Sequence, residues 1–146
     1  MQILNSMANN GLVVLQTPNP GITGVFSASS GLDGTSTSST AVIGYIQTGG
    51  VSFIPLFAFA KLSWNGGTVT VGPTIEIGFA VTPNEIVAGT VLNHTSNGGV
   101  TPLVLATPIP SFPVGSPSFF TTSVSVARTG TSTQVFVEVY LIGIYA

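Results

Sequence analysis

Charged side chains are scarce in this chain of 146 residues. They make up 4% of the sequence, against about 25% in ordinary soluble proteins. Two basic residues cannot neutralise a run of phosphates, so we expect no nucleic-acid partner. A freely dissolved monomer normally carries more charge than this, whereas the cores of protein interfaces are depleted in charge. The composition therefore predicts that partner subunits cover much of the surface.

Cysteine and long apolar runs are also missing. Without cysteine the sequence has no disulfide framework and gives no information on the redox compartment. The longest apolar run, 54–60, is interrupted by Pro55, and no stretch approaches the ~20 apolar residues that cross a membrane. Residues 1–10 have neither the basic nor the apolar region of a secretory signal. We therefore expect no membrane span and no secretory signal peptide.

Residues that could carry chemistry are few. His94 is the only histidine, and no nucleophile-elbow pattern surrounds any serine, so the sequence does not support a catalytic triad. A zinc site lacks ligands, and Asp33 alone is too little for calcium. We predict a protein that is not an enzyme and that uses no metal and no cofactor.

The few charges that fall inside predicted strands need partners. Glu76 and Glu138 could in principle form a glycosidase pair. A charge on an otherwise apolar strand is more simply explained by an ion pair, and the only cations are Lys61 and Arg128. We predict two structural pairs, Glu76 with Lys61 and Glu138 with Arg128, the second across a hairpin. Lys61 could instead meet a neighbouring subunit.

Short alternating segments separated by Gly, Pro and Asn run through the chain, and helical periodicity is nearly absent. This pattern predicts one antiparallel β-sandwich domain at 11–146, jelly-roll-like, with about eight strands and one short helical turn. Residues 1–10 are expected to be a flexible arm, and the polar segment 29–40 a loop. The main predicted strands are 11–16, 22–28, 41–47, 51–64, 74–81, 100–106, 119–128 and 134–145.

The segment 74–92 is the most informative stretch of the sequence. Ile75 and Ile77 fall on one face of its strand. The pattern then breaks at a capping box, in which the side chains of Thr82 and Glu85 would each accept a bond from the other's amide. With Pro83 in the first helical position and a stop at Gly89, one or two helical turns would form a corner between two sheets.

The segment 51–64 is apolar on both faces of a predicted strand, so both faces should be covered. The core covers one face of the strand, and a loop or another subunit must cover the other face. Pro55 marks a bulge or an edge position because it cannot donate to a ladder. The proline-rich segment 107–117 is expected to lie extended against an apolar surface. The predicted interface residues are Phe53, Phe57, Phe59, Ile109, Phe112 and Val114.

Two parts of the sequence together resemble the small head-decoration (cement) and minor capsid proteins of tailed bacteriophages. The first is the strand Thr-Ile-Glu-Ile-Gly at 74–78 with the turn and small-residue return at 82–89. The second is the Thr/Val-rich pair of segments 121–127 and 135–144. The resemblance implies a virion structural protein on the capsid surface. It also implies a homo-oligomer, often a trimer, with the major capsid protein as partner.

Three other functions remain open at this point. The chain could be a jelly-roll shell protein itself. It could be a subunit of an extracellular filament or adhesin that assembles by strand exchange, which needs a donated strand in a neighbour's groove. Finally, the aromatic side chains could form a sugar-binding platform, although core or interface packing is their default. These are Trp64, Tyr45, Tyr140 and Tyr145.

Overall fold

The fold was analysed in a computed structural model that describes residues 6–8, 12–15, 25–27, 32–44, 53–79, 82, 84–107 and 119–145. These residues form strands, turns and bends but no helix, and their paired strands are antiparallel. The predicted all-β class is therefore confirmed. The strands are β1 (Ser6–Ala8), β2 (Leu12–Leu15), β3 (Val25–Ser27), β4 (Leu32–Asp33), β5 (Thr40–Gly44), β6 (Phe53–Asn65), β7 (Val69–Val71), β8 (Thr74–Gly78), β9 (Val87–Val91), β10 (Gly99–Leu103), β11 (Phe119–Val126), β12 (Thr129–Gly130) and β13 (Gln134–Tyr145).

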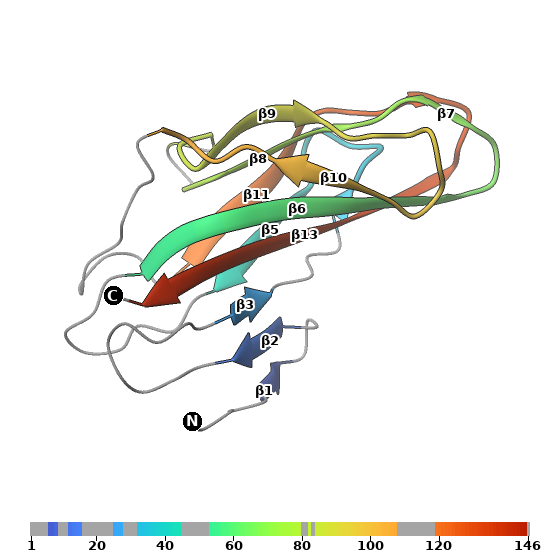
Figure 1. The fold of residues 1–146 in the computed structure, drawn as a ribbon. Helices are drawn as coiled ribbons and strands as arrows, with labels where there is room; N and C mark the ends of the chain where they lie inside the picture. The colour runs from blue at the N-terminus through green and yellow to red at the C-terminus, as the bar shows by residue number, and fades with distance from the viewer. Residues whose placement is uncertain are drawn as a thin grey trace.

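Two four-stranded sheets dominate the architecture (Figure 1). One has the strand order β10-β6-β13-β4 and the other the order β5-β11-β8-β9. A three-stranded sheet, β1-β2-β3, lies beside β13, and β12 and β7 form a small ladder at the other end. Within the segment 1–10, which the sequence predicts to be a flexible arm, Ser6–Ala8 pairs with β2.

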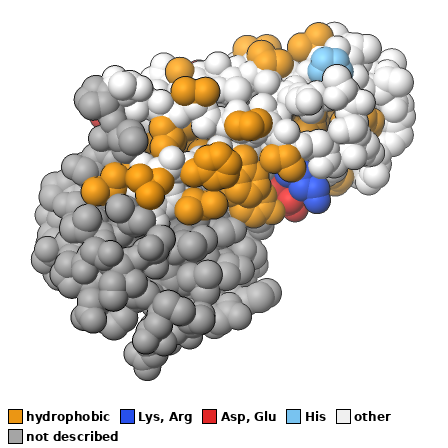
Figure 2. Space-filling view, viewed as in Figure 1, with side chains coloured by type: hydrophobic (Ala, Val, Ile, Leu, Met, Phe, Trp, Pro, Cys, Tyr) orange, Lys and Arg blue, Asp and Glu red, His pale blue; other side chains and the backbone are white. Residues whose placement is uncertain are grey.

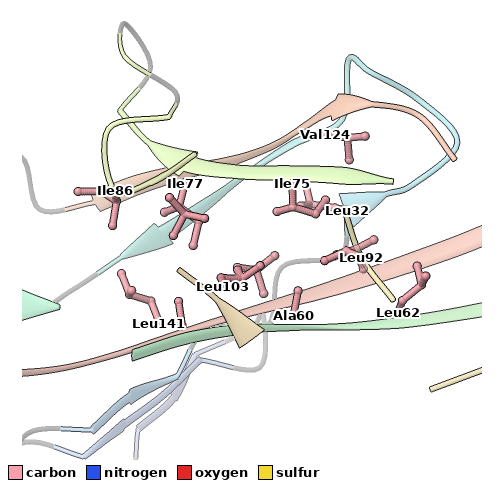
Figure 3. Close-up of a cluster of buried hydrophobic side chains, with 14 of the residues drawn as sticks. Leu32, Ala60, Leu62, Ile75, Ile77, Ile86, Leu92, Leu103, Val124 and Leu141 are labelled. Atoms are coloured by element: carbon pink, nitrogen blue, oxygen red, sulfur yellow. The ribbon is translucent and has the colours of Figure 1, made fainter. Parts of the chain in front are cut away.

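The two four-stranded sheets share one hydrophobic core. Leu62 and Leu141 point into it from one sheet, and Ile75, Ile77 and Val124 point into it from the other (Figure 3). All five side chains are almost completely excluded from solvent. The alternation of Ile75 and Ile77 with polar neighbours therefore predicted the core face of β8 correctly.

A bulge interrupts the longest strand pair. β6 and β13 run together from Asn65–Gln134 to Phe53–Tyr145, and the register shifts where Ile142 opposes Phe57 and Gly143 opposes Pro55. Leu56 is the extra residue, and it turns outward beside Phe57 while Pro55 is buried. The predicted bulge is confirmed, and it exchanges the faces that strict alternation would give Pro55 and Leu56.

The predicted helical turn after β8 is wrong. Thr82 Oγ1 does donate to Glu85 Oε2 at 2.8 Å, but the side chains bond each other rather than the amides. The amide of Ile86 donates to Ile77 O, and β9 begins at Val87. A segment this short makes too few helical hydrogen bonds to offset the cost of nucleation, and burial of Ile86 and Val87 favours an extended return strand.

The predicted hairpin between the last two long strands is also wrong. β11 pairs with β5 and β8, whereas β13 pairs with β4 and β6, so residues 129–133 cross from one sheet to the other. Thr68 O accepts bonds from the amides of Thr131 and Ser132. Gly130 has a φ of 132°, and a Cβ there would meet Thr68 O at 2.2 Å. Contact with β7 therefore directs this connection away from a local turn.

The shared core predicts a large difference between a core and a surface substitution. Ile77→Ala should lower the free energy of unfolding by about 2–5 kcal/mol, because it removes a fully buried side chain. Val42→Ala is the matched control on the same sheet. Val42 is 61% exposed, so its loss should cost less than about 0.5 kcal/mol. Chemical denaturation measures both, and equal losses would contradict the common core.

Candidate interaction surface

The outer side of the β10-β6-β13 sheet carries an apolar patch. Strand alternation puts Ala58, Ala60 and Leu62 inside and therefore puts Phe57 and Phe59 outside. We call this patch the aromatic face. Figure 2 shows its hydrophobic groups gathered over β6 and β13. Its members are Leu56, Phe57, Phe59 and Lys61 from β6, Phe136, Glu138, Tyr140 and Ile142 from β13, and Val100 and Pro102 from β10.

Three rings form the centre of the aromatic face. Phe59 and Tyr140 are directly opposite each other in the register, and their rings stack at a centroid distance of 4.6 Å and an angle of 14°. Phe57 adds a tilted ring 5.6 Å from Phe59. Such contacts stabilise the rings beyond simple burial and hold them in one arrangement. The face is therefore organised before any partner arrives.

One cation and one anion lie side by side on the aromatic face, between the Phe59–Tyr140 ring pair and Phe136. The register places Lys61 directly opposite Glu138, and Figure 2 shows a basic and an acidic group side by side at the border of the patch. The hydroxyl of Tyr140 donates to Glu138 Oε2 at 3.0 Å. Burial, together with this hydrogen bond and the negative charge of Glu138, raises the pKa of Tyr140 above its usual 10.0.

The rest of the described surface differs in kind. Four side chains of the aromatic face expose about half of their surface: Leu56 47%, Phe57 48%, Val100 53% and Phe136 46%. Among the described residues away from this face, the large hydrophobic side chains that are exposed are all valines. Isolated exposed valines are normal on a soluble protein, whereas a contiguous aromatic patch marks an interaction site.

The structure places three of the predicted interface residues on β6. Phe57 and Phe59 lie in the aromatic face. The backbone of Phe53 pairs with that of Tyr145, and the side chain of Phe53 lies outside the described atoms. Ile109, Phe112 and Val114 lie outside the described residues. The sequence reasoning did not include the contributions of β13 and β10. Along β13, Phe136, Tyr140 and Ile142 alternate with buried aliphatic residues, and this alternation was the sequence signal that they lie on the outer side of the sheet.

Neither predicted ion pair agrees with the geometry. Lys61 and Glu76 flank core residues of different sheets, so they point away from each other on opposite outer surfaces. Arg128 donates from its two terminal nitrogens to Gly130 O and Ser132 O, and its buried Nε has no acceptor in the described part of the chain. Because β11 and β13 are not paired, Arg128 is not opposite Glu138. Arg128 instead clamps the crossing connection.

No arrangement for chemistry emerges in the described ranges. Glu76 and Glu138 lie on the outer surfaces of different sheets and do not converge as a glycosidase pair would. No group of three or more His, Asp or Glu side chains among the described residues could hold a metal. A recess of about 270 Å³ beside β4 is lined by Asp33 but holds no second ionisable group. Trp64 packs against the core rather than forming a sugar platform with Tyr140.

The described segments contain no helix that is long and apolar enough to cross a membrane. Comparison with known proteins finds no matching family model, no similar curated protein and no similar solved structure. The architecture and the aromatic face are therefore the features from which a function can be inferred.

The environment of Tyr140 predicts a specific dependence of stability on alkaline pH. Since the folded protein raises the pKa of Tyr140, the native state favours the neutral phenol. This stabilisation is fully present below the ordinary tyrosine pKa and is lost as the pH rises through the raised value. Tyr140→Phe should remove this part of the pH dependence and one step above the ordinary tyrosine pKa in a tyrosinate absorbance titration. An unchanged titration in the variant would contradict the assignment.

The clamp made by Arg128 predicts a loss of stability without any ion pair. Arg128→Ala should lower the free energy of unfolding by about 1–3 kcal/mol, because two backbone carbonyls lose a charged donor. Val126→Ala is the control outside the aromatic face, and it should cost less than about 0.5 kcal/mol because Val126 is 57% exposed. If the cost of Arg128→Ala fell to that of the control, the clamp would have no energetic role. Thermal and denaturant unfolding both measure this difference.

Proposed function

We propose that this chain is a virion structural protein, a capsid decoration or cement protein that binds the capsid lattice as an oligomer and stabilises it. The major capsid protein would be its partner and the outer capsid surface its location. The mechanism is burial of surface. An interface of about 800 Å² per partner, repeated over a lattice, would raise the barrier to rupture of the shell.

The order of strand pairing is the observation that supports this proposal most. The strands of the two four-stranded sheets, numbered one to eight along the chain, are β4, β5, β6, β8, β9, β10, β11 and β13. The first strand pairs with the eighth (β4 with β13) and the second with the seventh (β5 with β11). The third pairs with the sixth (β6 with β10) and the fourth with the fifth (β8 with β9). A long hairpin wrapped into two sheets would pair its strands in this order, and the order therefore supports a jelly roll as part of the proposal.

Jelly rolls are common in viral capsid proteins and also occur in lectins and cupins. The step from this architecture to the virion is therefore an analogy at the level of the fold. Among the described residues no group of three or more His, Asp or Glu side chains could hold the metal of a cupin, and Trp64 packs against the core. What remains is a β domain with very few charges and one organised apolar face, which suits a subunit of an assembly.

The same pairing order also favours a second candidate, a jelly-roll shell protein that builds the lattice itself. A filament that assembles by strand exchange is less well supported. Edge strand β10 contains Pro102, which has no amide to donate to an added strand.

Sedimentation with capsids tests the proposed function. The purified chain is mixed with empty capsids of the virus that encodes it, and the pellet and the temperature of shell rupture are measured. Saturable binding and a higher rupture temperature are expected. Failure to bind those capsids would contradict a decoration role. Assembly of the chain alone into closed shells would instead support the shell candidate.

A further inference from the structure

We infer that the aromatic face is the surface through which copies of this chain bind one another. The inference rests on the oligomeric part of the proposed function, but it names the contact and the partner. The occupant of the face is a second copy of the chain rather than the shell. Three observations on the described residues carry it: the size of the patch, its rigidity and its charges.

The patch is large enough for a specific contact. Leu56, Phe57, Val100 and Phe136 each expose about half of their surface. With roughly 150–250 Å² for a large side chain, these four alone present on the order of 400 Å² of apolar area. Large contiguous patches of this kind usually mark protein contacts. Phe59, Tyr140, Ile142 and Pro102 add to it, which brings the face toward the roughly 800 Å² per partner of a stable interface.

The face is also rigid in the way that an interface centre requires. The rings of Phe59 and Tyr140 stack across the β6–β13 strand pair, and the Tyr140 hydroxyl donates a hydrogen bond to Glu138. Little side-chain entropy is therefore lost when a partner covers the rings. Buried aromatic side chains of this kind typically dominate the free energy of association.

The charges identify the partner as a second copy. A symmetric contact places a patch against its own duplicate, so a patch of one sign would repel itself. This face carries one cation, Lys61, and one anion, Glu138, in directly opposed positions. It is therefore neutral and self-complementary, since Lys61 of one copy can approach Glu138 of the next. A strongly charged partner would find no excess of opposite charge here.

Charge reversal in separate chains tests the inference without any capsid. Lys61→Glu makes the face doubly negative and Glu138→Lys makes it doubly positive. Each variant alone should self-associate at least about tenfold more weakly than the parent, because like charges then meet. An equimolar mixture of the two should recover most of the affinity and form mixed oligomers. Analytical ultracentrifugation measures the mass and the dissociation constant of each sample.

A second pair of variants keeps the test decisive if Glu138→Lys unfolds the chain. Phe57→Ser removes a half-exposed ring from the aromatic face, and Val126→Ser removes a half-exposed side chain from β11 on the other sheet. Only Phe57→Ser should weaken self-association, and unfolding midpoints report whether both variants fold.

Three results would overturn the inference: a monomeric parent chain at all concentrations, charge variants that associate like the parent, or equal effects of Phe57→Ser and Val126→Ser. A parent that is monomeric yet binds capsids would overturn this inference and leave the decoration role intact. A parent that self-associates through this face but ignores capsids would do the reverse.

Discussion

The antiparallel pairing of β6 with β13 is the constraint on which the rest of the structure depends. The two strands run together from Asn65–Gln134 to Phe53–Tyr145, and every other strand of their sheet joins one of them. Their inner sides supply seven of the seventeen buried side chains of the described core, and their outer sides supply most of the aromatic face. Because strand side chains alternate, one ladder fixes both surfaces at once.

The scarcity of charge and the aromatic face have the same physical explanation in this account. The six charged residues include two, Lys61 and Glu138, that lie on the aromatic face and oppose each other. Arg128 is occupied in holding the connection between the sheets. Few charges are therefore left to keep the surface soluble, and the proposed burial of the face between copies would remove the need for more.

The sequence predicted what depends on local alternation, and it was wrong where distant contacts decide. The all-β class, the core side of β8 and the bulge at Pro55 all follow from side-chain spacing and backbone chemistry. Local turn signals predicted a hairpin after Arg128 and a helical turn after Thr82. Pairing with β7 overrides the first signal, and burial of Ile86 overrides the second. Leu32 lies in a stretch of Ser, Gly and Thr that resembles a loop, yet it is completely buried in the core. For the site, β6 was predictable and the alternation along β13 was a signal for its outer residues, whereas the placement of β13 and β10 beside β6 could be known only from the sheet order.

Side-chain oxidation by hydroxyl radicals, measured as a function of protein concentration, tests the central claim most directly. Mass spectrometry would follow Phe57 and Tyr140 on the aromatic face, with Val42 and Val126 on the other sheet as internal references. The account predicts that oxidation of both rings falls as the chain associates, while that of the two valines stays constant. Rings that remain equally reactive in monomer and oligomer would contradict it.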